Sequence, residues 1–159
     1  MKTSLSGEVV AVDVESAYGG SVYERTVRID TGQTAIDCFE GKAHVTEEDC
    51  GKVIDVMLLA QRSTGALVSE TTEKGIFQDN EADDDRSQWH GTLRGEVVCA
   101  DSNELDSRED DSTILLDVGI GTILVSGQEE LKESIVDGNI NIGSIVQIES
   151  GRIDIIGRN

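Results

Sequence analysis

The chain has 159 residues, a formal net charge of −19 at pH 7 and only five aromatic side chains. A charge of this size and sign opposes binding to nucleic acid and to anionic lipid at low salt. Because large aromatic side chains are scarce, the core must be built from Val, Ile and Leu, which favour strands.

The first half of the chain predicts strands separated by short turns. Residues 22–30 alternate between two faces, which is the periodicity of a half-buried strand. Thr46 precedes three acidic residues and is typical of a helix N-cap, so it predicts one helical turn. The expected elements are a strand over 7–14, an open loop over 15–21, strands over 22–30 and 34–39, the turn after Thr46, a long strand over 52–61, a turn at 63–65 and a fifth strand over 66–70.

The second half repeats this order after an acidic connection. Residues 71–91 are expected to form a solvated linker, because their central part is rich in acids and nearly without apolar residues. Ser126 and Glu129 have the spacing of a capping box, which predicts a helix of about two turns. The remaining expected elements are strands over 92–100, 113–118, 122–126, 142–148 and 152–156, with an acidic loop over 101–112.

One short phrase opens both halves. Residues 7–10, with the sequence GEVV, return as residues 95–98. We expect the valines of each phrase in the core and its glycine at the entry of a strand. Further glycines hold matching positions in the two halves, at Gly32 and Gly119 and at Gly51 and Gly143.

Five strands with a helix between the third and the fourth resemble the oligonucleotide/oligosaccharide-binding (OB) barrel. Residues 113–156 also resemble a transport-associated (TOBE-type) OB domain. The resemblance implies an all-β fold of two tandem five-stranded OB-like β-barrels related by an internal repeat. Barrel 1 is expected over residues 1–70, the acidic linker over 71–91 and barrel 2 over 92–159. Two SH3-like barrels, or one continuous β-sandwich, are alternatives.

The sequence lacks the residue sets that carry catalysis or bind a metal. Its two histidines, His44 and His90, have no Cys or His partner at zinc spacing. No serine stands in a Gly-x-Ser-x-Gly motif, and no phosphate-binding glycine loop follows a strand. The acidic stretches break the pattern of a calcium loop. We therefore expect a protein that is not an enzyme and that has no cofactor and no metal.

The three cysteines, Cys38, Cys50 and Cys99, are odd in number and lack any Cys-x-x-Cys spacing. Cys38 and Cys99 stand within apolar strand patterns. A free cysteine in such a place is usually a small core residue, and we expect this role for both.

The OB resemblance implies a ligand surface on the second and third strands and their loops. In the first half this region gathers aromatic and basic groups, and nucleic-acid single strands bind by stacking on aromatics along a positive groove. Alternatively, the aromatics fill the barrel and Arg28 pairs with acids across the strands. Phe77 and Trp89 are expected to anchor the linker on the barrels, with ligand stacking as the alternative for Trp89. The candidate ligand-binding residues are Tyr23, Arg25, Arg28, Phe39, Lys42 and His44.

These features favour a non-catalytic binding or adaptor protein whose partner is another protein. The alternatives are single-stranded nucleic-acid binding through barrel 1 at high salt, an acidic inhibitor, immunity protein or nucleic-acid mimic, and small-oxyanion binding by TOBE-like barrels. Abundant acids and scarce lysine resemble the proteins of salt-loving archaea, where molar salt screens self-repulsion. An ordinary acidic bacterial or phage protein is the other interpretation. Without a signal-like or membrane-spanning apolar run, we expect a cytoplasmic protein that does not bind membranes.

Overall fold

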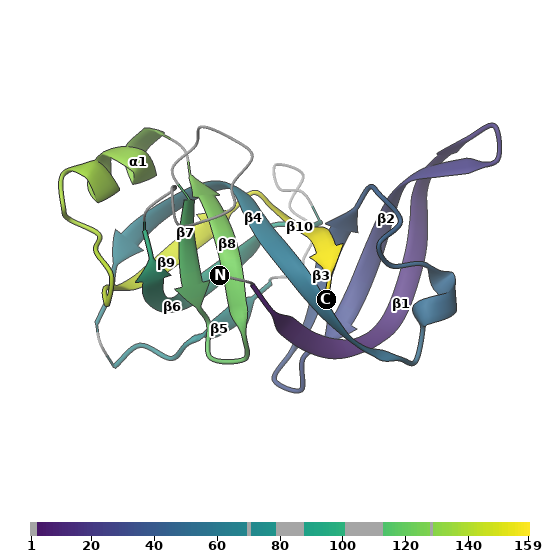
Figure 1. Ribbon diagram of the computed structural model, residues 1–159, viewed down its shortest axis with the longest axis horizontal. Helices are drawn as coiled ribbons and strands as arrows, with labels where there is room; N and C mark the ends of the chain where they lie inside the picture. Colours follow the sequence, from purple (N-terminus) through teal and green to yellow (C-terminus); the bar gives the residue numbers. More distant parts are fainter. Residues whose placement is uncertain (1–2, 70, 79–87, 101–112, 128) are drawn as a thin grey trace.

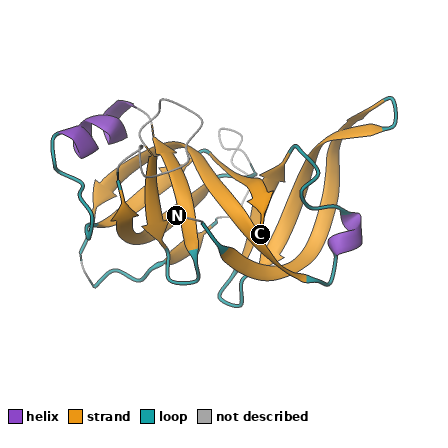
Figure 2. Cartoon of the chain, in the orientation of Figure 1, coloured by secondary structure: helices purple, strands orange, loops and turns teal. Residues whose placement is uncertain are grey.

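Strands make up most of the computed structural model, which confirms the all-β class expected from the sequence (Figure 2). None of its described helices is long and apolar enough to cross a membrane. The structure describes residues 3–69, 71–78, 88–100, 113–127 and 129–159.

The helical elements lie where the sequence predicts them. Helix α1 (Glu129–Val136) has about two turns, and η1 (Glu47–Asp49) is a single 3₁₀ turn that follows Thr46. The backbone N–H of Thr46 donates to the Asp49 carboxylate at 3.0 Å. The strands are β1 (Leu5–Tyr18), β2 (Ser21–Asp30), β3 (Ala35–Glu40), β4 (Val53–Leu67), β5 (Gly75–Phe77), β6 (Gly91–Cys99), β7 (Thr113–Asp117), β8 (Thr122–Gly127), β9 (Ile145–Ser150) and β10 (Arg152–Arg158).

The strands pair into two closed rings that share β4 (Figure 1). In the first ring, β1 pairs with β2 and β4, β3 pairs with β2 and β10, and β10 pairs with β4. In the second ring, β6 pairs with β7 and β9, β8 pairs with β7 and β4, and β9 pairs with β4. Figure 1 shows the rings as two lobes, with β4 running from one lobe to the other.

Each ring is completed by a strand from the other half of the chain. Strand β10 pairs antiparallel with β4 and bridges β3 through Asp154 and Phe39, so it belongs to the first ring. The far end of β4, residues 64–67, pairs with β9 of the second ring. Strand pairing crosses residues 71–91 in both directions. The division of the chain into two domains at this linker stays a prediction.

The expected turn at residues 63–65 and the separate strand over 66–70 are wrong. Strand β4 continues through residues 63–65 and ends at Leu67. Gly65 serves close packing here, since a Cβ at this position would lie 2.6 Å from Ile148 Cδ1. Ser63 is buried and donates its hydroxyl to a backbone carbonyl at 3.2 Å. Residue types that favour a turn are therefore used inside a strand, where neighbouring elements approach closely.

Both copies of the repeated phrase make the same backbone contacts. The carbonyl of Val9 accepts a hydrogen bond from Gly51 N–H at 2.7 Å, and that of Val97 accepts one from Gly143 at 2.8 Å. Each valine also donates its N–H to the residue after that glycine, at 2.9 Å in both copies. Gly51 and Gly143 have φ angles of 87° and 91°, which glycine adopts without steric cost. The shared contacts explain why these glycines recur together with the phrase.

The glycines of the phrase lie inside strands, and the expectation that they mark strand entries is wrong. A Cβ on Gly7 would lie 2.7 Å from the carbonyl oxygen of Asp30, and a Cβ on Gly95 would lie 2.2 Å from that of Asp117. The side chains of both aspartates accept a 2.8 Å hydrogen bond from the turn glycine two residues later. Each ring therefore needs glycine at this point so that its first two strands can approach.

Only one of the two valines in each copy of the phrase lies in the main core. Val9 and Val97 are buried, as expected. Val10 is instead 44% exposed, and Val98 is partly buried against a small second cluster around Leu115. Alternation along a strand turns successive side chains to opposite faces, which accounts for the difference.

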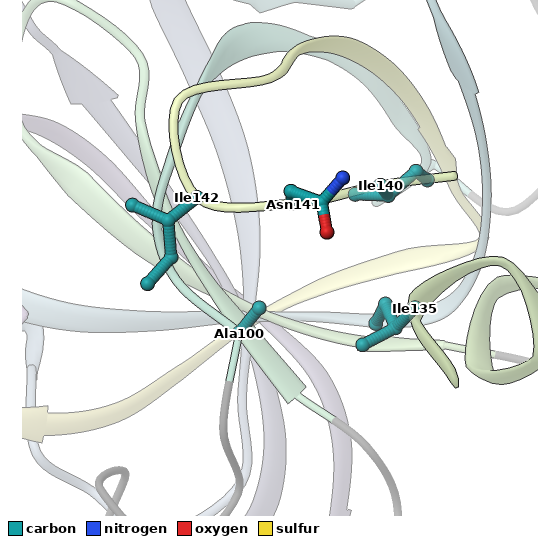
Figure 3. Close-up of a pocket in the computed structure, with 5 residues that line it drawn as sticks. All are labelled: Ala100, Ile135, Ile140, Asn141 and Ile142. Atoms are coloured by element: carbon teal, nitrogen blue, oxygen red, sulfur yellow. The ribbon is translucent and has the colours of Figure 1, made fainter. Parts of the chain in front are cut away.

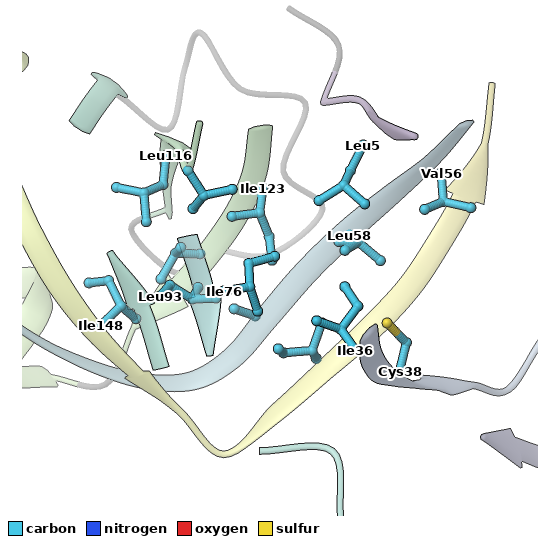
Figure 4. Packing of buried hydrophobic residues seen from close by; sticks show 14 of the residues in the cluster. Leu5, Ile36, Cys38, Val56, Leu58, Ile76, Leu93, Leu116, Ile123 and Ile148 are labelled. Atoms are coloured by element: carbon cyan, nitrogen blue, oxygen red, sulfur yellow. The ribbon is translucent and has the colours of Figure 1, made fainter. Parts of the chain in front are cut away.

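One continuous cluster of buried apolar side chains fills both rings (Figure 4). The cluster includes Ile36 of β3 in the first ring and Leu93 of β6 in the second ring. Leu58 lies between them on the shared strand β4. Cys38 and Cys99 are buried free thiols, as expected, whereas Cys50 is exposed. Burial raises the pKa of the Cys38 thiol. Because the core is shared, we expect the rings to support each other's stability.

Two stretches expected to be irregular contain strand. Strand β1 continues to Tyr18, and a two-residue glycine turn joins it to β2. Strand β5 lies inside the expected linker and pairs antiparallel with β6. The acidic stretches at 79–87 and 101–112 lie outside the described residues.

Candidate binding surface

Phe39, Trp89 and Arg152 meet on the outer face of the first ring, and we call these residues the aromatic cluster. Ile36 and Cys38 of β3 face the core, so Phe39 faces outward. Its ring packs edge-on against Trp89, with ring centroids 5.1 Å apart. The guanidinium of Arg152 lies over the Phe39 ring, 4.2 Å from its centroid.

Trp89 connects this cluster with two further strands. Its indole Nε1 donates to Thr26 Oγ1 on β2 at 2.9 Å, and its carbonyl accepts from Ile153 N–H on β10 at 2.9 Å. The Thr26 hydroxyl donates in turn to Glu15 Oε1 at 2.8 Å. Trp89 therefore ties the segment before β6 of the second ring to the first ring.

Asp154 lies beside the aromatic cluster and is nearly buried. Nε and Nη2 of Arg152 donate to its carboxylate at 2.7 and 2.9 Å, and Gln61 donates to it as well. Burial raises the pKa of Asp154 more than these hydrogen bonds lower it. The charge of Arg152 is thus shared between a carboxylate and an aromatic ring of the same protein.

The arginines predicted to bind a ligand are each paired with an acid. Nε and Nη2 of Arg28 donate to the two carboxylate oxygens of Asp37 at 2.8 and 3.1 Å, across the β2–β3 pair. This hydrogen bond and the charge of Asp37 raise the pKa of Arg28. Arg25 is buried on the opposite face of β2, and its Nε lies 3.4 Å from Glu47 Oε1. The two arginines therefore do not form one positive groove.

The other predicted ligand-binding residues are dispersed. Lys42 is exposed in the loop after β3, and its backbone N–H donates to Glu40 Oε1 at 2.6 Å. His44 is half-buried in the same loop. Within the described structure, its Nε2 and the Oε2 atom of the fully buried Glu40 have no hydrogen-bond partner. The side chain of Tyr23 lies outside the described part. The five predicted residues whose side chains are described do not converge on one surface.

Phe77 on β5 packs against the second ring, with the Arg94 guanidinium 4.8 Å from its ring centroid. The next residue, Gln78, reaches the first ring. Its Oε1 accepts from the Asp37 N–H at 2.6 Å, and its Nε2 donates to the Asp37 carbonyl at 2.9 Å. The side-chain amide of Gln78 thus binds the edge of β3 as a neighbouring strand would.

An open apolar hollow of about 420 Å³ lies on the second ring, between α1 and the end of β6 (Figure 3). None of its lining side chains is charged, so the hollow offers apolar contact and little that would orient a ligand. The lining residues are Ala100, Ile135, Ile140, Asn141 and Ile142.

Strands β1 and β2 extend beyond the first ring as a two-stranded projection, which Figure 1 shows at the upper right. Strand β1 pairs with β4 over residues 5–8, and β2 pairs with β3 over residues 25–30. We call residues 13–18 of β1 and 21–24 of β2 the ribbon. Among the described residues, those of β1 in the ribbon pair only with β2, and those of β2 in the ribbon pair only with β1.

The ribbon exposes both apolar side chains and backbone. Val14 is 49% exposed and Tyr18 is 80% exposed. The backbone bonds from β1 to the β4 side end at Val9, as far as the described chain shows. An unpaired strand edge is the usual place at which another chain adds a strand.

The aromatic cluster could not be predicted from the sequence. Trp89 and Arg152 stand far from Phe39 in the chain and reach it through the strand exchange and the segment before β6. One signal was present, because Arg152 and Asp154 alternate with isoleucines in a strand pattern. That pattern indicates a polar outer face but does not identify the strand beside it.

No set of three or more His, Cys, Asp and Glu side chains that could hold a metal ion occurs in the described ranges. Comparison with protein-family models, with curated proteins and with solved structures gave no match.

Proposed function

We propose that this chain is a non-catalytic binding protein, made of two OB-like barrels that exchange their fifth strands, and that its partner is another protein. The strand order supports the barrel assignment. In each ring three strands follow one another in the chain, a helical element precedes the fourth, and the fifth is parallel to the third. The fifth strand is β10 in the first ring and β4 in the second.

The ribbon is the observation that carries the choice of a protein partner. Its free edge and exposed Val14 and Tyr18 suit an extended protein segment, which pairs with a strand through backbone hydrogen bonds. Three arginines of the first ring fit nucleic acid less well. Arg25, Arg28 and Arg152 each contact a carboxylate of the same chain, so they form no row of open charges for phosphates.

Photo-crosslinking at the salt concentration of the native cell tests this proposal. A photoreactive amino acid replaces Tyr18 in the ribbon, and a matched control places it at Val136, which is also 80% exposed but lies on α1 of the second ring. We expect a defined protein adduct from position 18 that is missing from position 136. Equal adducts at both positions, or none at position 18, would contradict the proposal.

Single-stranded nucleic-acid binding by the first ring is a second candidate, and the aromatic cluster favours it. Bases stack on aromatic side chains and on arginine, and OB barrels bind oligonucleotides on their second and third strands. Fluorescence anisotropy with labelled oligonucleotides, from low to molar salt, tests it against the Phe39→Ala variant. Binding that does not depend on Phe39, or no binding at any salt, rules it out.

The remaining hypotheses gain no support from the described structure. Inhibition or nucleic-acid mimicry would rest on the acidic stretches 79–85 and 101–111, which lie outside the described residues. Small-oxyanion binding needs open cations or backbone N–H groups around a cavity, and the described hollow is lined by apolar side chains and one asparagine.

A further inference from the structure

We infer that the free edge of β1 at residues 13–18 takes an extended partner segment, in which apolar and basic residues alternate, as an added β-strand. This inference rests on the proposed function and specifies the chemistry of the partner. It follows from the unpaired backbone of this edge, the two faces of the ribbon and its charge.

The backbone of this stretch has one strand neighbour. Residues 13–18 pair with β2 on one side, and among the described residues no strand lies hydrogen-bonded on the other side. Alternate residues of a regular strand direct their N–H and C=O groups to the same side, but the pairing of this stretch with β2 shifts register between Val14 and Ser16 and between Ser16 and Ala17. The six residues therefore provide fewer positions for an added strand than the roughly three of a regular strand. The bonds would replace contacts with water and would fix the partner in extended conformation.

One face of the ribbon is apolar near the ring. Val12 pairs with buried Val27 across β2 and packs on the main core. Val14 pairs with Arg25, which lies on the same face as Val27. The core side of β1 thus continues outward into Val14, which is half exposed. Every second side chain of an added strand would lie next to this apolar row.

The other face of the ribbon carries carboxylates. Asp13 pairs with Thr26, and Glu15 accepts the hydroxyl hydrogen of the same threonine, so both acids lie on the outer face. Both are exposed, and neither makes an ion pair within the described part of the chain. The alternate side chains of an added strand would face these acids, and basic side chains would neutralise them.

The same acids argue against a second copy of this chain as the occupant. Pairing two ribbons edge to edge would bring Asp13 and Glu15 of one copy close to those of the other. Like charges next to one another in paired strands are destabilising, and acidic side chains on an edge protect against self-association. A basic segment of a different protein meets no such repulsion.

A synthetic peptide of eight residues that alternates valine and lysine serves as the probe, titrated by fluorescence anisotropy into the full chain. Two control peptides have the same side chains, one in block order and one methylated on every backbone nitrogen. We expect the alternating peptide to bind at least about tenfold more tightly than either control, because the controls lose the side-chain register or the hydrogen bonds. At saturation, amide hydrogen exchange should slow within residues 13–18.

Matched variants of the protein separate strand addition from charge attraction alone. Asp13→Asn with Glu15→Gln removes the ribbon acids, and we expect about a threefold to tenfold loss of affinity. Glu133→Gln with Asp137→Asn makes the same charge change at exposed positions of the second ring and should leave the affinity unchanged.

Several results would overturn the inference: equal binding of the methylated peptide, equal losses in the two double variants, or protection from exchange outside residues 13–18. Formation of a dimer through the ribbon in sedimentation experiments would also overturn it. Crosslinking at Tyr18 reports separately on the proposed function. An adduct there without peptide binding would refute strand addition alone, whereas peptide binding without an adduct would refute the proposed protein partner.

Discussion

The two rings share their backbone plan and differ in what surrounds it. In both rings a glycine allows the first two strands to meet, and an aspartate holds the turn that follows. The first ring adds the ribbon, a single 3₁₀ turn and the buried polar side chains of Arg25 and Glu40. The second ring adds α1, whose Leu131 is buried, and buries further apolar side chains such as Leu93 and Ile148. The parts that recur build the rings, and the groups suited to binding lie where the rings differ.

The strand exchange makes this comparison testable, because each ring depends on residues from the other half of the chain. The first experiment removes β10, by deleting residues 152–159. Ile153 and Ile155 then leave the shared core, and β3 and β4 lose the strand between them. We expect losses of about 2–5 kcal/mol for each isoleucine, which is enough to unfold a domain of ordinary stability.

Hydrogen exchange locates the effect of this deletion. Amides of β2 and β3 should lose their protection, although the deleted residues belong to the second half of the sequence. If residues 1–70 formed an independent unit, β2 and β3 would keep the protection of the full-length chain, and that result would contradict the exchange. Ile148→Ala, which opens a cavity in the second ring without removing a strand, is the control.

The second experiment asks whether the repeated glycines are equivalent. Alanine at Gly7 or Gly95 would bring its Cβ within 2.7 or 2.2 Å of a backbone carbonyl oxygen. We expect each substitution to lower the free energy of unfolding by about 3 kcal/mol or more, measured by urea denaturation. Gly32→Ala is the control, because its Cβ would meet open space and its φ of 89° should cost about 1–2 kcal/mol. If only one of the two alanine variants lowered the free energy of unfolding strongly, the two glycines would not be equivalent.

Much of this plan could be predicted from sequence. Alternation and glycine-rich turns identified most strands, because these signals act over a few residues. The exchange could not be predicted, since the pattern of residues 152–156 shows one buried face and not the strand beside it. The turn expected at residues 63–65 was wrong for a similar reason. Ser63, Thr64 and Gly65 favour a turn, but close packing against Ile148 requires the glycine within a strand. For the candidate site, one of the two interpretations of the sequence paired Arg28 with acids across the strands, which neighbouring strands allow, whereas the approach of Trp89 to Phe39 depends on the whole fold.

A third experiment concerns Asp55 on β4. Its side chain binds the residue before β1 and the residue after β10. Its carboxylate accepts from Ser4 Oγ at 2.7 and 2.8 Å and from Asn159 Nδ2 at 3.0 Å. The hydrogen bond from Ser4 and then that from Asn159 lower the pKa of Asp55. A lowered pKa means that the carboxylate stabilises the fold above the unfolded value of about 3.9, and that this stability is lost as the pH falls through the folded pKa.

Asp55→Asn should therefore lower the free energy of unfolding by about 1 kcal/mol at pH 7, since partial exposure weakens bonds to a charged group. The difference from the unchanged protein should shrink as the pH falls below about 4. Urea denaturation at a series of pH values measures it. Asp137→Asn, which removes the same charge at an exposed position of the second ring, is the control. A difference that is constant with pH would contradict the assignment.

The smallest expected effect tests how the chain crosses between the rings. It crosses through Gly151 between β9 and β10, and through Arg62 within β4, where the pairing with β8 shifts register. Arg62 has a φ of 54°, a left-handed conformation that costs a side-chain-bearing residue about 1–2 kcal/mol. Arg62→Gly removes this cost but adds flexibility to the unfolded chain, so we expect a net gain of less than about 1 kcal/mol. Arg62→Ala is the matched control, because it removes the same charge near Asp154 and keeps the strained backbone. The glycine variant should be the more stable of the two in urea denaturation. If the two variants are equally stable, Arg62 is held at this crossing without strain.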